Sequence, residues 1–192
     1  MKKSFLTISL SLIAMMAFSQ AKLEIGLKGG LNSSKLNIDE AGLKESASSS
    51  FHAGIYTLIK VSKIGIQPEI LYSPRKNNID FGSGNVEQKQ VYLDIPIMVK
   101  LYLAAGVNLQ AGPQIGILTS AESAGVDVKD NLKGSDFSVA FGLGWDAPFG
   151  LQANVRYLLG LSDINDAGSG SAKITSRTFQ FSLGYRLFKI GN

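Results

Sequence analysis

Apolar and polar residues alternate with a period of two along most of the chain after residue 20, and helical periodicity is almost absent. In one segment, for example, Val107, Leu109 and Ala111 are separated by Asn108 and Gln110. Because successive side chains of a β-strand point to opposite faces, this alternation predicts strands with one apolar and one polar face. Eight segments show the pattern: 23–28, 51–60, 64–73, 91–101, 107–117, 136–146, 151–159 and 178–187.

The connections between these segments alternate in length. Short connections lie at 61–63, 104–106 and 147–150, whereas long polar ones cover 32–50, 74–89, 119–134 and 162–176. An even number of strands of about ten residues, with short turns at one end and long loops at the other, is typical of bacterial outer-membrane barrels. We therefore predict an all-β fold, an eight-stranded antiparallel up-and-down transmembrane β-barrel located in the outer membrane.

Residues 1–19 have the layout of a secretory signal peptide. Two lysines follow Met1, an apolar stretch comes next, and the small residues Ala17 and Ser19 precede the expected cleavage site. A second candidate cleavage site follows Ala21. The alternative is an amphipathic core helix, but the stretch is apolar all round rather than on one face. The mature chain, 20–192, is expected to form one barrel domain outside the cytoplasm.

A soluble lipocalin-like lipid binder is an alternative, because it also has eight strands and follows a signal peptide. A soluble barrel needs a charged outer face, whereas the polar face here carries few charges and many small or amide residues, which suit a narrow lumen. Aromatic residues on the apolar face fall near both strand ends, as expected of girdles at the level of the lipid headgroups. They are Phe51, Tyr72, Phe137 and Phe179 at the long-loop ends, and Trp145 and Tyr185 at the short-turn ends.

Three prolines interrupt the strand pattern at Pro68, Pro96 and Pro113. A proline cannot donate a ladder hydrogen bond, although every strand of a closed barrel must pair on both sides. We expect these prolines to mark β-bulges.

Composition narrows the classes of function. The 192 residues include no cysteine, which excludes disulfide frameworks, thiolate metal sites and cysteine nucleophiles. Hydrophobic residues make up 45% of the chain and the formal net charge is only +4, so intrinsic disorder is excluded. Lys2 and Lys3 belong to the signal peptide and the other basic residues form no run, so no nucleic-acid partner is expected.

Catalytic and cofactor motifs are weak, and we expect neither enzyme activity nor a cofactor. The single histidine, His52, would be the base of a rim hydrolase or acyltransferase next to Ser50, but no Gly-x-Ser-x-Gly motif accompanies it. We interpret it as a rim histidine facing the lumen mouth. Segment 163–168 departs from a calcium loop at Ala167, and 82–84 lacks the lysine of a phosphate loop.

Five charged residues fall on the face predicted to line the lumen. Charges inside a narrow barrel are costly unless they are paired, so we expect an ionic network that plugs the lumen and fixes strand register. The alternative is the selectivity ring of a small pore. Asp94 and Lys100 lie ~20 Å apart along one strand, so each needs a partner from another strand. The expected network residues are Glu69, Asp94, Lys100, Arg156 and Arg186.

Segment 92–100, Tyr-Leu-Asp-Ile-Pro-Ile-Met-Val-Lys, is similar to the YL[DE]IP...K motif of the PorT-like outer-membrane β-barrel family of Bacteroidota. The resemblance implies a small eight-stranded outer-membrane barrel, which in some members is associated with type IX secretion and gliding. Four further segments show weaker similarity and extend the resemblance over nearly the whole mature chain: 26–32, 67–73, 111–116 and 182–187.

Taken together, these features predict a non-enzymatic outer-membrane barrel with a plugged polar lumen, whose surface loops contact other molecules. The expected partners are outer-membrane lipids, the barrel-assembly machinery, and secretion or envelope proteins. The remaining alternatives are a narrow channel or small-ligand-binding barrel, a rim enzyme, and a soluble secreted lipid binder.

Overall fold

The computed structural model describes residues 21–38, 48–80, 85–123, 126–129, 133–161 and 174–191. The proposed signal peptide, the calcium-loop-like segment and residues 82–84 lie outside the described residues. Within the described ranges, no helix has the length and apolar character needed to cross a membrane.

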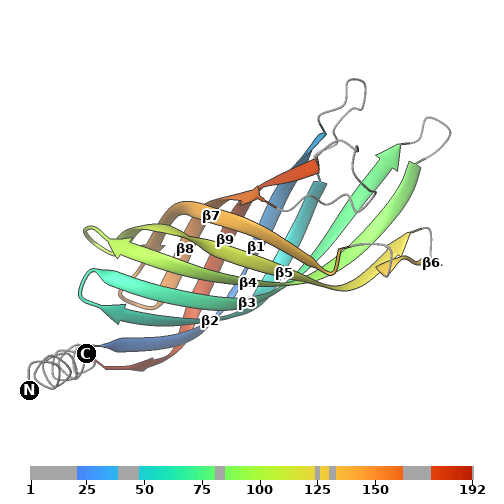
Figure 1. Cartoon of the computed structure of the whole chain (residues 1–192). Helices are drawn as coiled ribbons and strands as arrows, with labels where there is room; N and C mark the ends of the chain where they lie inside the picture. The colour runs from blue at the N-terminus through green and yellow to red at the C-terminus, as the bar shows by residue number, and fades with distance from the viewer. Residues whose placement is uncertain are drawn as a thin grey trace, which may run out of the picture.

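Eight long strands close into an antiparallel barrel (Figure 1). Each long strand pairs with its sequence neighbours, and β1 pairs with β9, so the first and last strands seal the ring. The eight-stranded up-and-down barrel predicted from the alternation is therefore confirmed. A ninth, two-residue strand, β6, pairs only with β5. The strands are β1 Lys22–Ile38, β2 Ser48–Val61, β3 Ile64–Asp80, β4 Asn85–Tyr102, β5 Val107–Ser123, β6 Val126–Asp127, β7 Ser135–Asp146, β8 Leu151–Gly160 and β9 Ile174–Ile190.

Tight turns join the strands at one end of the barrel. The turn between β4 and β5 has two successive residues with positive φ, Ala105 at 51° and Gly106 at 83°, and Gly150 before β8 has a φ of 100°. A Cβ at Gly106 would lie 2.2 Å from the carbonyl oxygen of Asp146, so this turn requires glycine for space as well as for φ. The predicted short connections therefore lie where the structure has its tight turns.

At the opposite end the strands run past their predicted limits. The segment 74–89, predicted as a long loop, is instead largely a hairpin, because β3 continues to Asp80 and pairs with β4 from Asn85 onward. The predicted loops 32–50, 119–134 and 162–176 are also shortened, since β1, β5 and β9 extend into them. Ladder hydrogen bonds join backbones and need no apolar side chain, so pairing continues after the alternation ends.

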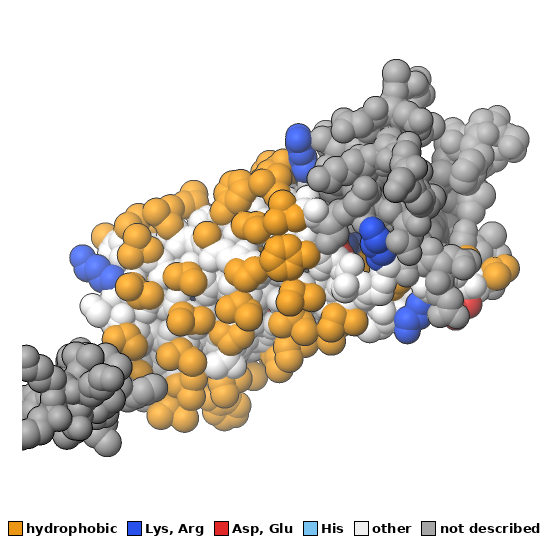
Figure 2. Space-filling view, viewed as in Figure 1, with side chains coloured by type: hydrophobic (Ala, Val, Ile, Leu, Met, Phe, Trp, Pro, Cys, Tyr) orange, Lys and Arg blue, Asp and Glu red, His pale blue; other side chains and the backbone are white. Residues whose placement is uncertain are grey.

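The two faces of the barrel wall differ sharply. Outward-facing side chains are apolar and exposed, such as Ile55 (50% exposed), Val99 (49%) and Leu143 (57%), and they cover the wall in Figure 2. Inward-facing side chains are polar and buried, such as Gln67 and Lys100, both 0% exposed. A soluble lipid binder requires the reverse arrangement, with a polar exterior around an apolar cavity.

The three strand prolines do not mark bulges, which corrects the expectation from sequence. The register shifts lie elsewhere, at Ile25/Gly26 and at Val91/Tyr92. Each of the three prolines keeps one cross-strand partner: Pro68 on β4, Pro96 on β5 and Pro113 on β7. On the other side, toward the preceding strand, the ladder is interrupted beside each proline, but the register is the same before and after the interruption. A proline lacks one N–H, and losing that single bond does not require an extra residue.

We expect Ile97→Arg to lower the free energy of unfolding in phospholipid vesicles by about 2–4 kcal/mol, because Ile97 is 45% exposed and lies near the middle of the outward apolar positions of β4, which run from Val91 to Leu101. Val126→Arg is the matched control, since Val126 is 64% exposed on β6, outside the ring. It should change the free energy by no more than about 0.5 kcal/mol. Urea unfolding followed by fluorescence of the one tryptophan measures both; equal effects would contradict the assignment of the outer face to lipid.

Candidate functional site: the ionic network inside the barrel

A triad of charged side chains crosses the middle of the lumen. Lys28 of β1 donates to both carboxylate oxygens of Glu69 on β3, at 2.9 and 3.1 Å, and Arg156 of β8 donates two bonds to the same carboxylate, at 2.6 and 2.9 Å. Gln67 adds a fifth bond at 2.7 Å. All three charged side chains are at most 3% exposed. Because β3 and β8 lie on opposite sides of the ring, the triad spans the lumen.

The triad continues into a chain of amides. The Nε of Arg156 donates to Gln110 Oε1 at 3.0 Å, and Gln110 Nε2 donates to Asn154 Oδ1 at 2.9 Å. A buried ion pair repays its desolvation only when further hydrogen bonds satisfy the remaining donors and acceptors. These amides provide such bonds, so the centre of the lumen is held by one connected polar network.

Glycines lie beside the inward charges on neighbouring strands. Lys28 has Gly54 and Gly184 beside it on the two adjacent strands, and Arg156 has Gly142 beside it on β7. A Cβ at Gly54 or Gly142 would lie 1.9 or 2.0 Å from a carbonyl oxygen of the next strand, so these two glycines permit a close approach of the backbones. The same arrangement places Gly116 beside Asp94, Gly65 beside Lys100 and Gly26 beside Arg186.

A second cluster lies nearer the long-loop end. Arg75 of β3 donates to Asp94 Oδ1 at 3.0 Å and to Asp136 Oδ2 at 3.4 Å, and its guanidinium lies 4.1 Å from the centre of the Tyr92 ring. The Arg75 side chain is 25% exposed, whereas that of Asp94 is 3% exposed. This cluster is therefore more accessible to water than the central triad.

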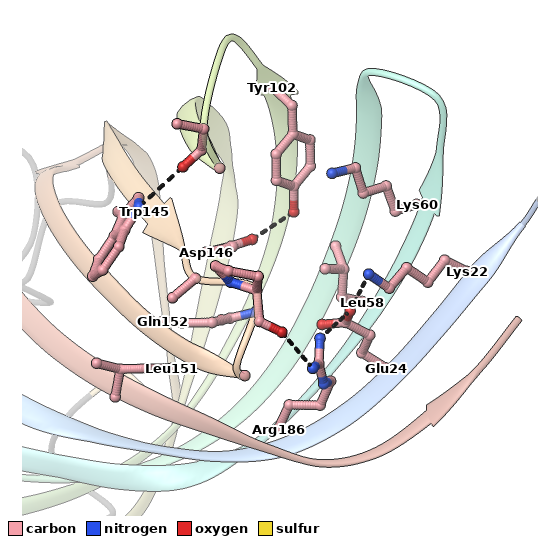
Figure 3. A pocket seen from close by; sticks show the side chains of 15 residues that line it. Lys22, Glu24, Leu58, Lys60, Tyr102, Trp145, Asp146, Leu151, Gln152 and Arg186 are labelled. Carbon is pink, nitrogen blue, oxygen red and sulfur yellow. Dashed lines mark hydrogen bonds and ion pairs between the residues drawn. The ribbon is translucent and has the colours of Figure 1, made fainter. Parts of the chain in front are cut away.

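A third cluster lies at the short-turn end (Figure 3). Lys100 donates to both oxygens of Asp146, at 3.1 and 3.0 Å, and the Tyr102 hydroxyl donates to Asp146 Oδ2 at 2.5 Å. Glu24 accepts from Arg186 at 2.9 Å and forms an ion pair with Lys22 at 3.0 Å. The short-turn mouth thus contains two carboxylates, each already bound to at least one cation.

The structure places all five charged residues proposed from sequence inside the barrel, but it joins only two of them to each other, Glu69 and Arg156. Asp94, Lys100 and Arg186 take partners that the sequence analysis did not consider. Four of the missed residues, Glu24, Lys28, Asp136 and Asp146, occupy polar-phase positions of the predicted strands, so the alternation itself carried the signal. Arg75 lies in a segment predicted to be a loop.

His52 does not lie at the rim, which corrects its interpretation from sequence. It is 1% exposed, and its Nε2 lies 2.9 Å from the hydroxyl oxygen of Ser182 on β9. Ser182, not Ser50, is thus its serine partner, and Nδ1 has no hydrogen-bond partner in the structure. Among the described residues, no group of three or more His, Asp or Glu side chains is placed to hold a metal ion.

The six proposed girdle aromatics all lie on the outer face, between 39% exposed for Trp145 and 55% for Tyr185. Phe51 and Tyr72 contact each other on adjacent strands, with ring centroids 6.4 Å apart. Phe179 contacts Tyr157 of β8 in a tilted arrangement, with centroids 4.7 Å apart, and Trp145 contacts Phe149 edge-on. Tyr157 and Phe149 are aromatic neighbours that the sequence analysis did not include.

Comparisons with known proteins agree with this geometry. A family model described as an outer membrane protein β-barrel domain matches residues 18–166. No curated protein sequence matches. Among solved structures, Neisserial surface protein A superposes with a TM-score of 0.55 at 10% identity, covering 85% of this chain and 97% of that one. The attachment invasion locus protein Ail of Yersinia pestis gives a TM-score of 0.50 at 15% identity, with coverages of 85% and 98%.

We expect Glu69→Gln to lower the free energy of unfolding by about 3–5 kcal/mol, because it leaves the buried cations Lys28 and Arg156 without a counter-charge. Asp94→Asn is the matched comparison. Its partner Arg75 is partly exposed and keeps Asp136, so the loss should be smaller, about 1 kcal/mol. Urea unfolding in vesicles gives both values; an Asp94→Asn loss equal to or above that of Glu69→Gln would contradict the central role of the triad.

Proposed function

The chain belongs to the family of outer membrane protein β-barrel domains and is an outer-membrane protein, and from this premise we propose that it is a non-conducting, non-enzymatic barrel. In this proposal the barrel anchors a contact surface, which its strands present on the long-loop side. In outer-membrane barrels that side faces the cell exterior. A narrow channel is the competing function.

The observation that carries the proposal is the central triad. Lys28, Glu69 and Arg156 occupy the lumen between opposite walls, and both cations are bound to the one carboxylate rather than presented to a passing ion. A selectivity ring needs charged groups that face water along the path of the ion. Side chains that are at most 3% exposed do not meet that requirement.

The hairpin formed by the outer ends of β3 and β4 supports a contact role. The two strands stay in register from Pro74↔Val91 to Asp80↔Asn85, and most residues of this stretch are polar. A polar paired segment beyond the apolar wall is suited to water rather than lipid. Anchoring alone does not need such a projection, so we assign the hairpin to contact with other molecules.

The proposed partner is a secretion or envelope protein. This step depends on the similarity of segment 92–100 to the PorT-like motif, and we assign the chain to that group of outer-membrane barrels on the same basis. The barrel-assembly machinery and the lipids of the outer membrane are the further partners that a barrel of this kind requires.

Purified protein in planar lipid bilayers should show no stable discrete conductance, because the triad closes the lumen. A variant with Lys28, Glu69 and Arg156 all changed to Ala removes the plug and should conduct if it folds, which anomalous migration of the unboiled protein checks. Large, stable, ion-selective conductance of the unaltered protein would replace the present proposal with the channel.

The contact surface is tested in living cells by placing a photo-cross-linking amino acid at Asn78 of the hairpin, with Leu143 on the lipid-facing wall as the matched position. We expect discrete protein adducts from position 78 and only lipid adducts from 143. Identification of the adducts by mass spectrometry then tests the secretion-partner assignment. The same adducts from both positions, or none from 78 in cells where the barrel is folded, would contradict a contact role for the hairpin.

A further inference from the structure

A cavity of about 570 Å³ opens at the short-turn mouth of the barrel, on the side opposite the proposed contact hairpin (Figure 3). Its wall combines strand residues, such as Lys60 of β2 and Gln152 of β8, with turn residues, such as Ala105 and Pro148. Tyr102, Leu58, Leu151 and Trp145 also border it, and the Trp145 side chain points to the outer face of the barrel. Pockets of this size and mixed lining hold small organic ligands.

The charges around the cavity do not balance. Lys22, Lys60 and Arg186 line it together with two carboxylates, those of Glu24 and Asp146. Glu24 is shared between Lys22 and Arg186. Asp146 already binds a fourth cation, Lys100, and the Tyr102 hydroxyl. The cavity therefore has a surplus of positive charge, which favours an anionic ligand.

Lys60 is the cation best placed to receive that ligand. Its ammonium lies 3.4 Å from the centre of the Tyr102 ring. Among the described residues, no carboxylate forms an ion pair with it, in contrast to Lys22 and Arg186. A cation held by a ring retains the capacity to bind a carboxylate, because an ammonium has three donors and the ring faces only one side.

Gln152 gives an independent indication of a ligand. The side chain is 2% exposed and lines the cavity, yet neither Nε2 nor Oε1 has a hydrogen-bond partner. Within the described part of the chain, it is the one buried side-chain amide whose nitrogen and oxygen both lack partners. Leaving a buried polar group without a partner costs about 1–3 kcal/mol, so the site gains from a ligand that supplies both bonds.

We propose that this cavity binds the free C-terminal carboxylate of an extended peptide, with Lys60 pairing with the carboxylate and Gln152 pairing with the backbone of the residue before it. The N–H and C=O of one extended residue point to the same side, so they match the acceptor and donor of a glutamine amide. Inorganic phosphate also satisfies the cation, and at neutral pH its P–OH group can donate to Gln152 Oε1, so phosphate is the competing probe in the test. Short turns of outer-membrane barrels face the periplasm, so the peptide would come from that side.

Trp145 makes the site measurable, because it is the single tryptophan of the chain and lines the cavity. The experiment titrates the full chain in detergent micelles with the acetylated tripeptide Ala-Ala-Leu, either with a free carboxylate or as the C-terminal amide. Acetate and inorganic phosphate are the simple-anion probes. We expect saturable quenching or a spectral shift with the free acid, and binding at least about tenfold weaker with the amide, since a charged hydrogen bond is lost.

Two variants separate the two contacts. Lys60→Gln should weaken binding of the free-acid peptide and of acetate alike, whereas Gln152→Leu should weaken the peptide about tenfold and leave acetate unchanged. Lys63→Gln is the matched control, because Lys63 is an exposed lysine on the turn that follows β2 and does not line the cavity. It should bind the peptide like the unaltered protein. Anomalous migration of unboiled samples verifies that each variant is folded.

Equal affinities for acid and amide, or absence of saturation by the free acid, would overturn the proposal. Tight phosphate binding that is unaffected by Gln152→Leu, with no preference for the peptide, would replace it with a simple anion site. If Gln152→Leu does not fold, the NMR resonance of the Gln152 side-chain NH₂ group in the unaltered protein tests the contact instead. The proposal requires that this resonance shift when the free-acid peptide is added and stay in place with acetate. Because the site lies on the opposite mouth, these outcomes are independent of the hairpin contact test.

Discussion

The interior of an eight-stranded ring has room only for side chains, and this limit governs the arrangement of the inward charges that the structure describes. A charge that points inward cannot keep a full hydration shell, so it needs a counter-charge and hydrogen bonds from other lumen side chains. Glu69 meets this requirement with Lys28, Arg156 and Gln67 at once.

The barrel is more tightly closed at its centre than at its mouths. The triad lies among side chains that are at most 3% exposed, while Arg75 toward one mouth and Lys60 toward the other are partly open to water. Under the proposed function, a closed centre with two accessible ends keeps the two sides of the membrane apart. The proposed partners of the hairpin and of the cavity would then act on opposite sides.

Several features of the fold follow from local sequence alone. The two-residue period identifies the eight strands and the tight turns, because each side chain's face depends on its place in the strand. Strand ends were harder to predict, since β3 and β4 continue to pair where the apolar alternation stops. The prediction that the strand prolines mark β-bulges was wrong for a related reason. Whether a missing N–H causes a bulge depends on the partner strand, and Pro68, Pro96 and Pro113 each keep one partner without a shift of register.

The sequence by itself determined which side chains enter the lumen and which face lipid, because that choice depends only on odd or even position along a strand. It did not determine which of the inward charged side chains form ion pairs with each other. Lys28 and Glu69 are 41 residues apart, and Glu69 and Arg156 are 87 apart. Their contact depends on strand tilt, on register and on ring closure between β1 and β9. Only the tertiary structure fixes those three quantities, so it alone decided the ionic triad, the burial of His52 beside Ser182 and the cavity around Gln152.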